Sequence, residues 1–255
     1  MIAYTRRAFI LDSLGKKGVI SLKETAKELG VAEITVRRDF EKLESEGKLK
    51  RVQGGAASPD NPDGAELTMS SKLPQNTGEK AKAAQMAAEL VQDGESVFID
   101  GGTTMIPLAD ILCKRAVRIV TYNTIILQKV ANPLAQIIMI GGEYMPYYNM
   151  NVGPIAQEML GQFCFDRAFF GCAGINTQQR VVYSTEYESL NIKRIAMENA
   201  KENYLIVDSS KFSKQGFLKL CGTECFDAIL SSEVPEDAEF LPNMIATTQG
   251  HSPST

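Results

Sequence analysis

Apolar residues recur at the spacing of one helix face in two short stretches near the amino terminus. They stand at i, i+4 and i+7 within 22–29 and again within 33–46, so each stretch predicts a helix with one buried side. Ser21 and Glu24 have the spacing of a capping box, which places the start of the first helix at residue 22. Gly30 should end that helix, because glycine readily takes the left-handed conformation of a C-terminal cap.

The residues on either side of this helix pair predict further elements. Tyr4–Leu14 should form an earlier helix that packs on the pair, with Gly15 and Gly18 bracketing the turn after it. Lys48–Val52 alternates like a short strand, and the Gly-Gly pair that follows indicates a tight turn. This is the outline of a winged helix-turn-helix, whose second helix enters the major groove of DNA. The alternative is an ordinary amphipathic helix pair with solvated charges.

Basic side chains on the second helix and the strand are suited to DNA. Arg37 and Arg38 lie off the apolar stripe and can contact guanine edges or phosphates. Lysine and arginine on the strand would follow the backbone beside the groove. The predicted DNA-binding residues are Ser21, Thr35, Arg37, Arg38, Lys48, Lys50 and Arg51.

The rest of the chain alternates apolar strands with helices. Continuous apolar strands separated by helices indicate a parallel sheet covered on both faces. The predicted strands are 96–100, 117–121, 136–140, 167–170, 204–207 and 228–230, and the predicted helices are 79–91, 105–112, 123–131, 155–160 and 186–200. We therefore expect a winged helix-turn-helix domain at 1–56, a linker rich in Pro, Gly and Asp at 57–72, an α/β domain at 73–248 and a tail at 249–255.

Small polar residues fill the turns at several predicted strand ends. These turns are Asp100–Thr104, Gly141–Gly142, Gly171–Gly174 and Asp208–Lys211. Ligands of open parallel sheets bind outside the carboxyl ends of the strands, and glycines before a helix allow backbone N–H groups to approach a phosphate. Each turn could instead be a plain tight turn. Nearby Lys80, Lys193 and Lys211 are candidate cations, although Lys80 and Lys193 could each simply be an exposed helix lysine.

Composition and charge narrow the class of protein. The first 55 residues carry 12 Lys and Arg against 8 Asp and Glu, whereas the remainder carries 15 against 23, so a basic head precedes an acidic body. The chain has five cysteines and one histidine, His251. An odd number of cysteines argues against a disulfide framework, so we expect them to be buried small hydrophobes. We expect no metal, no cofactor, and no Ser-His-Asp or Cys-His catalysis.

The sequence carries no long apolar run and no signal peptide. We therefore expect a cytoplasmic protein without a membrane partner.

The stretch 21–56 resembles the amino-terminal domain of the DeoR-type (sugar-catabolism repressor) transcriptional regulators. The residues that carry the resemblance are Thr35, Val36, Arg37, Arg38, Asp39, Phe40, Leu43, Glu44, Gly47, Leu49, Arg51, Gly54, Gly55 and Ala56. Two positions depart from the family pattern. Ala32 replaces the serine that caps the second helix, a loss of about 1 kcal/mol, and Gln53 replaces a histidine.

Residues 72–232 are similar to the sensor domain of the same family, whose fold is akin to ribose-5-phosphate isomerase. The family's phosphate loop matches Asp100–Thr104, and the motif around Asn76, Glu79 and Lys80 also matches. The resemblance implies an effector site for a phosphorylated sugar or a related metabolite. The residues assigned to it are Lys80, Asp100, Gly101, Gly102, Thr103, Thr104, Tyr122, Asn123, Gly141, Gly142, Gly171, Glu186, Lys193, Asp208 and Lys211. Either Tyr122 or Asn123 would face the ligand, and Glu188 is an alternative to Glu186.

Two functions fit these observations. The first is a repressor that binds double-stranded operator DNA as a homo-oligomer, a dimer or tetramer, since two heads read two half-sites. The second is an isomerase or CoA-transferase-like enzyme with the same sheet architecture. Sugar-phosphate isomerases of this fold have paired carboxylates in the turn that corresponds to Gly171–Gly174, where this chain has none. The sequence therefore favours the regulator.

Overall fold

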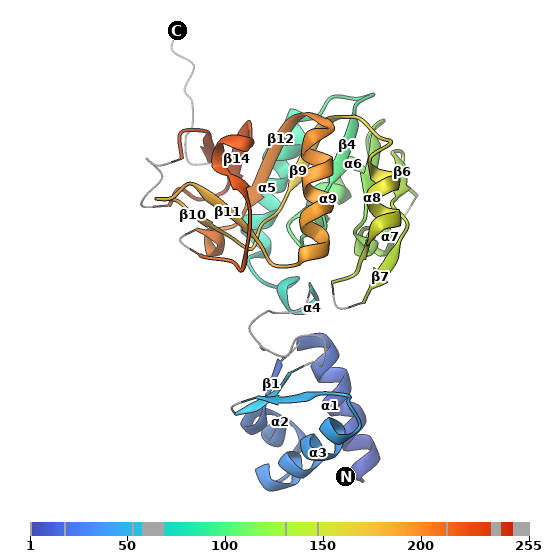
Figure 1. Ribbon diagram of the computed structural model, residues 1–255, viewed down its shortest axis with the longest axis vertical. Helices are drawn as coiled ribbons and strands as arrows, with labels where there is room; N and C mark the ends of the chain where they lie inside the picture. The colour runs from blue at the N-terminus through green and yellow to red at the C-terminus, as the bar shows by residue number, and fades with distance from the viewer. Residues whose placement is uncertain are drawn as a thin grey trace. The chain divides into compact units, whose positions relative to one another are not determined.

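The computed structural model describes residues 2–17, 19–52, 54–57, 69–130, 132–146, 148–212, 214–235 and 241–246. The chain divides into two compact units, residues 1–75 and 76–255 (Figure 1). Within the stretch expected to be linker, residue 57 ends a strand and residues 69–72 form a short helix, α4 (Met69–Lys72). The rest of that linker and the tail at 249–255 lie outside the described residues.

The first unit is a winged helix-turn-helix, as predicted. Its elements are α1 (Ala3–Lys17), β1 (Val19–Ser21), α2 (Leu22–Leu29), α3 (Glu33–Ser45), β2 (Lys50–Val52) and β3 (Gly55–Ala57). The turn expected at Gly15 was wrong, because α1 continues through that residue. Gly30 ends α2 at φ 63°, in the left-handed conformation that the sequence predicted.

The three strands of this unit form one antiparallel sheet in the order β1-β3-β2. The central strand, β3, occupies residues that the sequence indicated as a turn and domain end. Gly55 begins it because a Cβ there would lie 2.1 Å from the carbonyl oxygen of Ile20, so only glycine allows the two strands to approach this closely. Apolar side chains from α1, α2, α3 and the sheet form the core of the unit.

The second unit is built on seven strands, each parallel to its neighbours. In spatial order they are β15 (Met244–Ala246), β14 (Ala228–Ser231), β12 (Ala200–Val207), β9 (Phe165–Phe170), β4 (Ser96–Ile99), β5 (Arg118–Thr121) and β6 (Gln136–Met139). The predicted parallel α/β architecture is therefore confirmed. Strand β15 was not predicted.

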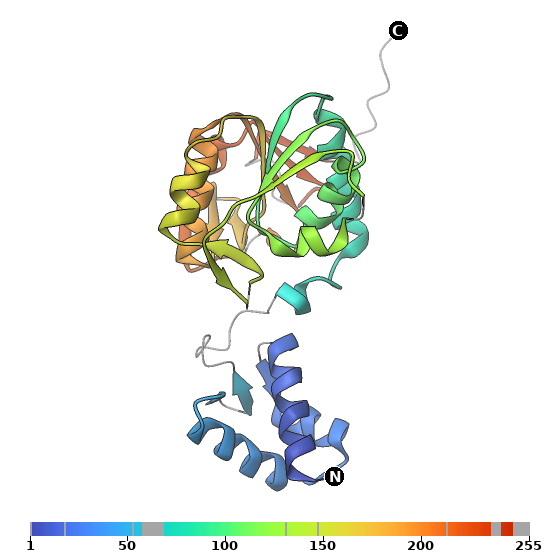
Figure 2. The ribbon, with the colours of Figure 1, turned by 90° about the vertical axis from the view of Figure 1, so that its right-hand side faces the viewer.

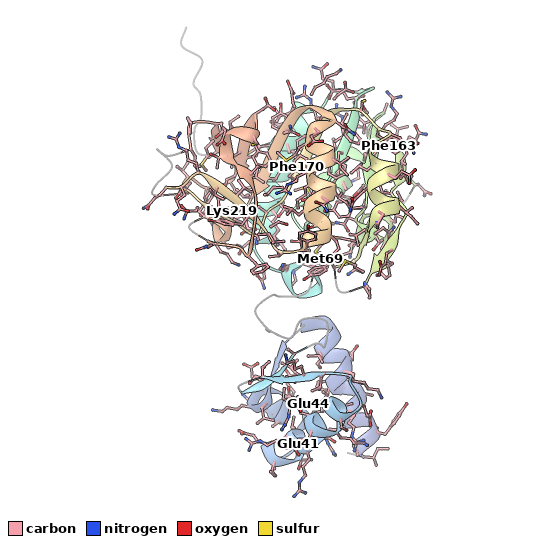
Figure 3. All side chains as sticks on the ribbon, viewed as in Figure 1. Glu41, Glu44, Met69, Phe163, Phe170 and Lys219 are labelled. Carbon is pink, nitrogen blue, oxygen red and sulfur yellow. The ribbon has the colours of Figure 1, made fainter. Side chains whose placement is uncertain are left out.

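Helices cover both faces of this sheet (Figure 2). One face carries α5 (Thr77–Leu90), α6 (Met105–Leu112) and α7 (Thr124–Lys129), and the other carries α8 (Pro154–Leu160) and α9 (Tyr187–Glu198). Small alanines along α5 let it pack closely on α6 and the strands beneath. On the other face, the Phe98 ring packs on both Phe165 and Phe170, the latter labelled in Figure 3.

Smaller elements surround the carboxyl edge of the sheet. They are the hairpin β7 (Glu143–Met145) and β8 (Met150–Val152), the antiparallel sheet of β10 (Gly174–Asn176), β11 (Val181–Ser184) and β13 (Leu218–Gly222), and the 3-10 turns η1 (Ser209–Lys211) and η2 (Thr223–Cys225). The sequence predicted a turn at Asp208–Lys211, where η1 lies, and gave no expectation for the other elements.

Candidate functional site

Helix α3 presents two different faces. Val36, Phe40 and Leu43 are buried in the core, whereas Arg37 and Arg38 are exposed. Neither arginine has a hydrogen-bond or ion-pair partner among the described residues. Two free guanidinium groups on the second helix of this motif are suited to contact base edges or phosphates.

The remaining residues predicted to bind DNA have mixed surroundings. Ser21 is the N-cap of α2, where its hydroxyl accepts from the Glu24 N–H at 3.4 Å. Lys48 donates to Glu46 at 2.8 Å, and Lys50 is exposed on β2. Thr35 is half-buried on α3. Arg51 is paired with two carboxylates of α3. Of the basic residues predicted to bind DNA, some are therefore free of partners in the described part of the chain, whereas Lys48 and Arg51 already bond to carboxylates of the protein.

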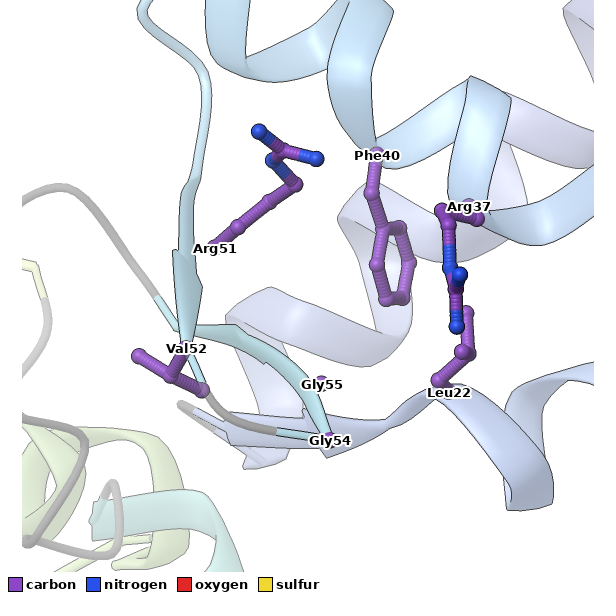
Figure 4. Close-up of a pocket in the computed structure, with 7 residues that line it drawn as sticks. All are labelled: Leu22, Arg37, Phe40, Arg51, Val52, Gly54 and Gly55. Carbon is purple, nitrogen blue, oxygen red and sulfur yellow. The ribbon is translucent and has the colours of Figure 1, made fainter. Parts of the chain in front are cut away.

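A pocket of about 320 Å³ opens between α3 and the wing formed by β2 and β3. Its lining residues are Leu22, Arg37, Phe40, Arg51, Val52, Gly54 and Gly55. In Figure 4 the Phe40 ring lies between Arg37 and Arg51. The pocket thus has apolar walls and a guanidinium group on either side.

Asp39 follows Arg37 and Arg38 in the sequence, but its side chain faces the interior of the first unit. It is 2% exposed and accepts hydrogen bonds from Arg6 and from Arg7, the latter at 3.0 Å. The hydrogen bond to Asp39 raises the pKa of Arg6 above its ordinary value. A buried carboxylate needs such partners, so Asp39 joins the second helix to α1. The sequence matched Asp39 to a family motif without revealing its partners, which stand 32 and 33 residues earlier.

In the second unit, the predicted turns meet at one edge of the sheet. Neighbouring strands β12, β9, β4, β5 and β6 are parallel. Their carboxyl ends therefore bring together Asp208, Gly171, Asp100, Tyr122 and Gly141.

Asp100 is the centre of a buried hydrogen-bond network at this edge. Its carboxylate accepts from the Tyr122 hydroxyl at 2.6 Å, from the Gly171 N–H at 2.9 Å and from the Lys193 ammonium. Lys193 also donates to the Gly171 carbonyl at 2.9 Å. Burial, together with the adjacent Asp100, raises the pKa of Tyr122 well above its usual range, so the phenol remains a donor. These groups bind one another and connect three strand ends.

Asn123 also supports the turn after β4. Its side-chain NH₂ donates to the Gly101 carbonyl at 3.0 Å, and its carbonyl oxygen accepts from the Ile125 N–H at 3.0 Å. Tyr122 and Asn123 are both fully buried. Both residues of the Tyr122–Asn123 turn therefore hold the Asp100–Thr104 loop from within.

The first turn of α5 is bonded to the turn after β12. Asn76 donates to Asp208 at 2.8 Å, and the Ser209 N–H donates to Glu79 at 2.7 Å. Although burial alone would raise the pKa of Asp208, hydrogen bonds from Ser210 and Asn76 hold it below its ordinary value. Asp208 is therefore an anion that fixes the start of α5.

The other assigned residues line the same edge with different exposure. Lys80 and Lys193 are 5% and 6% exposed, so the alternative that they are exposed helix lysines is wrong. Lys211 is half-buried, as is Glu186, which accepts from the Ser189 hydroxyl. Gly142 has φ 136°, and a Cβ there would lie 2.5 Å from the Val152 carbonyl.

Cys172 is a residue of this edge that sequence reasoning did not select. Burial raises the pKa of its thiol to about 12, against the opposing effect of Lys211 and Lys193. It is therefore a neutral group beside two cations at physiological pH. Its signal in the sequence was only its place directly after Gly171.

The cysteines do not behave as one class. Cys113 is buried as expected, but Cys164 and Cys225 are exposed, and Cys172 and Cys221 are intermediate. The expectation of buried small hydrophobes was therefore wrong for Cys164 and Cys225, whereas Cys172 and Cys221 are half-buried. Among the described residues, no cluster of three or more His, Cys, Asp or Glu could hold a metal ion. No helix in the described part of the chain is long and apolar enough to cross a membrane.

Comparison with known proteins covers both units. Residues 6–61 match the DeoR-like helix-turn-helix domain, and residues 75–233 match the DeoR C terminal sensor domain. The lactose phosphotransferase system repressor of Lactococcus lactis subsp. lactis is 34% identical over 227 residues, which are 87% of this chain and 88% of that protein. The repressor of the same name from Staphylococcus epidermidis is 28% identical over 91% of this chain and 92% of its own.

Among solved structures, ribose 5-phosphate isomerase A from Methanocaldococcus jannaschii resembles 55% of this chain over 56% of its own length. The TM-score is 0.41 and the sequence identity is 18%. The two domain matches and the long alignment with the lactococcal repressor carry the assignment. The chain belongs to the DeoR family of DNA-binding transcriptional regulators, with an amino-terminal helix-turn-helix domain and a carboxyl-terminal sensor domain.

Proposed function

We propose that this regulator represses a carbohydrate-utilisation operon in the cytoplasm and responds to a phosphorylated sugar bound at the carboxyl edge of its sensor sheet. The observation that carries this proposal is that one chain contains both features: free Arg37 and Arg38 on α3 of the first unit, and a set of glycine turns at one sheet edge of the second. Relatives named lactose phosphotransferase system repressors support both the repressor role and the sugar class.

The phosphate would bind the backbone N–H groups of Gly101 to Thr104, at the amino terminus of α6, where the helix dipole favours an anion. Lys193 donates to Asp100 and Gly171, which leaves its ammonium largely occupied. Half-buried Lys211 is better placed to meet a phosphate at the mouth of the site. The full set of residues assigned in the sequence remains the proposed effector site.

The active species would be a homo-oligomer, because paired half-sites need two heads. The effector would favour one of two conformations of the protein by binding it more tightly, and that conformation would no longer match the spacing of the half-sites.

The test is fluorescence anisotropy of the full chain with a labelled duplex from upstream of its own gene, titrated with phosphorylated sugars. We expect tight, salt-sensitive binding that one sugar phosphate reverses. Lys211→Ala should keep the DNA affinity and lose the response, whereas Lys82→Ala, at an exposed lysine of α5, should retain both. Tight binding that no sugar phosphate alters would refute the proposed effector class.

A further inference from the structure

Arg51 differs from the other basic residues predicted to contact DNA. Its guanidinium donates to Glu44 at 2.6 Å and to Glu41 at 3.1 Å, and its backbone N–H donates to the second Glu44 oxygen at 2.9 Å. Arg37 and Arg38 have no such partners among the described residues. Arg51 is therefore an arginine of this surface whose Nε and Nη1 already donate within the protein.

The three hydrogen bonds join two separate elements. Glu41 and Glu44 stand three residues apart on α3, which places them on the same side of the helix, and both are labelled in Figure 3. Arg51 is the middle residue of β2, opposite Ala56 of β3. The planar guanidinium suits such a multiple contact. The hydrogen bonds from Arg51 also lower the pKa of Glu44, so that carboxylate stays ionised.

Beside these bonds, a pocket lies between the helix and the wing. Its lining includes Arg37, Phe40, Val52 and Gly54 (Figure 4). Strand β2 has three residues and, within the described part of the chain, pairs with β3 alone. So short an edge strand has little stability of its own. Its position relative to α3 therefore depends on contacts outside the sheet.

We propose that Glu44, with Glu41, makes Arg51 a positioning residue for operator binding. The contact sets the distance between the wing and α3, and Arg51 acts through Glu44 rather than through a DNA phosphate. This inference rests on DNA binding by the amino-terminal unit and adds the residues that arrange its surface.

The first test asks whether neutralising a glutamate of α3 strengthens or weakens DNA binding. DNA is a polyanion, so neutralising an acid near it removes repulsion and should leave binding equal or tighter. Glu33→Gln, at an exposed acid in the first turn of α3 with no partner among the described residues, should behave in that way. Glu44→Gln should instead weaken binding about three- to tenfold. Tighter binding by Glu44→Gln, equal to that of Glu33→Gln, would overturn the proposal.

Salt dependence gives a second test. Each phosphate contact adds about 0.9 to the slope of log affinity against log salt concentration. Lys50→Met, at the exposed neighbour on β2, should reduce that slope. Arg51→Met should weaken binding without reducing it, and adding Glu44→Gln should weaken binding no further. A reduced slope for Arg51→Met would assign it a direct phosphate contact and exclude the positioning role.

The probe for both tests is a duplex that the wild-type full chain selects from a random pool. Amide hydrogen exchange of the full chain without DNA decides the proposal independently. Glu44→Gln should raise exchange in residues 50–57 and leave α9 unchanged, whereas Glu33→Gln should change neither. Failure to select any duplex would count against operator binding alone. Unchanged exchange in Glu44→Gln would show that Glu44 does not hold the wing.

Discussion

Charged residues mark both functional regions of this regulator, but they are arranged in opposite ways. On the DNA-binding unit, Arg37 and Arg38 are exposed and have no partner among the described residues. At the carboxyl edge of the sensor sheet, the side chains of Asp100 and Lys193 are 0% and 7% exposed and bond to one another. One region presents its charge to solvent, while the other uses its charge internally.

The comparison shows two different uses of charged residues, one for binding and one for holding the fold. Exposed cations can attract a polyanion at long range and then contact it. A buried ion pair loses hydration on burial and persists when its geometry and further hydrogen bonds compensate for that loss. At the sensor edge, Asp100 and Lys193 fix the turns after β4 and β9 through Gly171. Under the proposed function, backbone N–H groups and half-buried side chains such as Lys211 would then be left to meet the ligand.

The largest expected effect is on the buried pair. Lys193→Met leaves Asp100 as a buried, uncompensated charge, which should cost about 3–5 kcal/mol of the free energy of unfolding. Urea denaturation of the sensor unit measures it. Lys82→Met, at an exposed lysine, is the control and should change stability by less than about 0.5 kcal/mol. Equal stability of the two variants would mean that the pair is not structural.

An intermediate effect is expected on the exposed arginines. Arg37→Ala should weaken operator affinity by about 1–3 kcal/mol if the guanidinium reads a base, without destabilising the fold. Anisotropy with the selected duplex and with a mismatched duplex measures both affinity and discrimination. A variant that binds both duplexes like the wild type would remove Arg37 from the reading set. A uniform loss on both would assign it to a phosphate instead.

A smaller effect is expected at the start of α3. Ala32 has an extended backbone conformation and offers no side-chain cap, so Ala32→Ser should stabilise the DNA-binding unit by about 0.5–1 kcal/mol. Ser21→Ala, at the capped start of α2, should destabilise the same unit by a similar amount. Thermal unfolding of both variants tests this pair, and a destabilising Ala32→Ser would contradict it.

The smallest expected effect appears at acid pH and concerns the opposite end of the sensor sheet. Hydrogen bonds from Lys201 and from the Ser96 N–H lower the pKa of Asp166 to about 2. Because the unfolded carboxyl titrates near about 3.9, this contribution is present above that pH and is lost as the pH falls towards 2. Asp166→Asn should therefore flatten the fall of stability between about pH 4 and 2. An unchanged acid profile would show that Asp166 contributes nothing to it.

The long apolar patterns were enough to predict the main architecture. The helices of the head, the parallel sheet and the turns at its carboxyl edge follow from periodicity and from the parallel-sheet rule. The missed strands are short, with three residues in β1, β3 and β10, four in β11 and five in β13. Segments that short form strands because of the partners they pair with, which local propensity does not contain.

Side-chain roles were harder to predict than turn positions. Lys193 was recognised as a candidate cation, but its partner Asp100 stands 93 residues away. Asn76 and Asp208 are separated by 132 residues. Arg51 was placed on the DNA backbone because its strand is basic, while the acids that occupy it belong to the preceding helix. Only the folded chain reveals which charges are already satisfied.

The hydrogen bonds at the start of α5 have a mechanical consequence. The chain enters the sensor unit at Asn76, whose side chain donates to Asp208. Glu79, in the first turn of α5, accepts from the N–H of Ser209, the residue after Asp208. Tension applied through the amino-terminal unit would load these two bonds before it reached the interior of the sheet. Conversely, if the proposed effector displaced Asp208, it would move the point at which the connecting chain is attached.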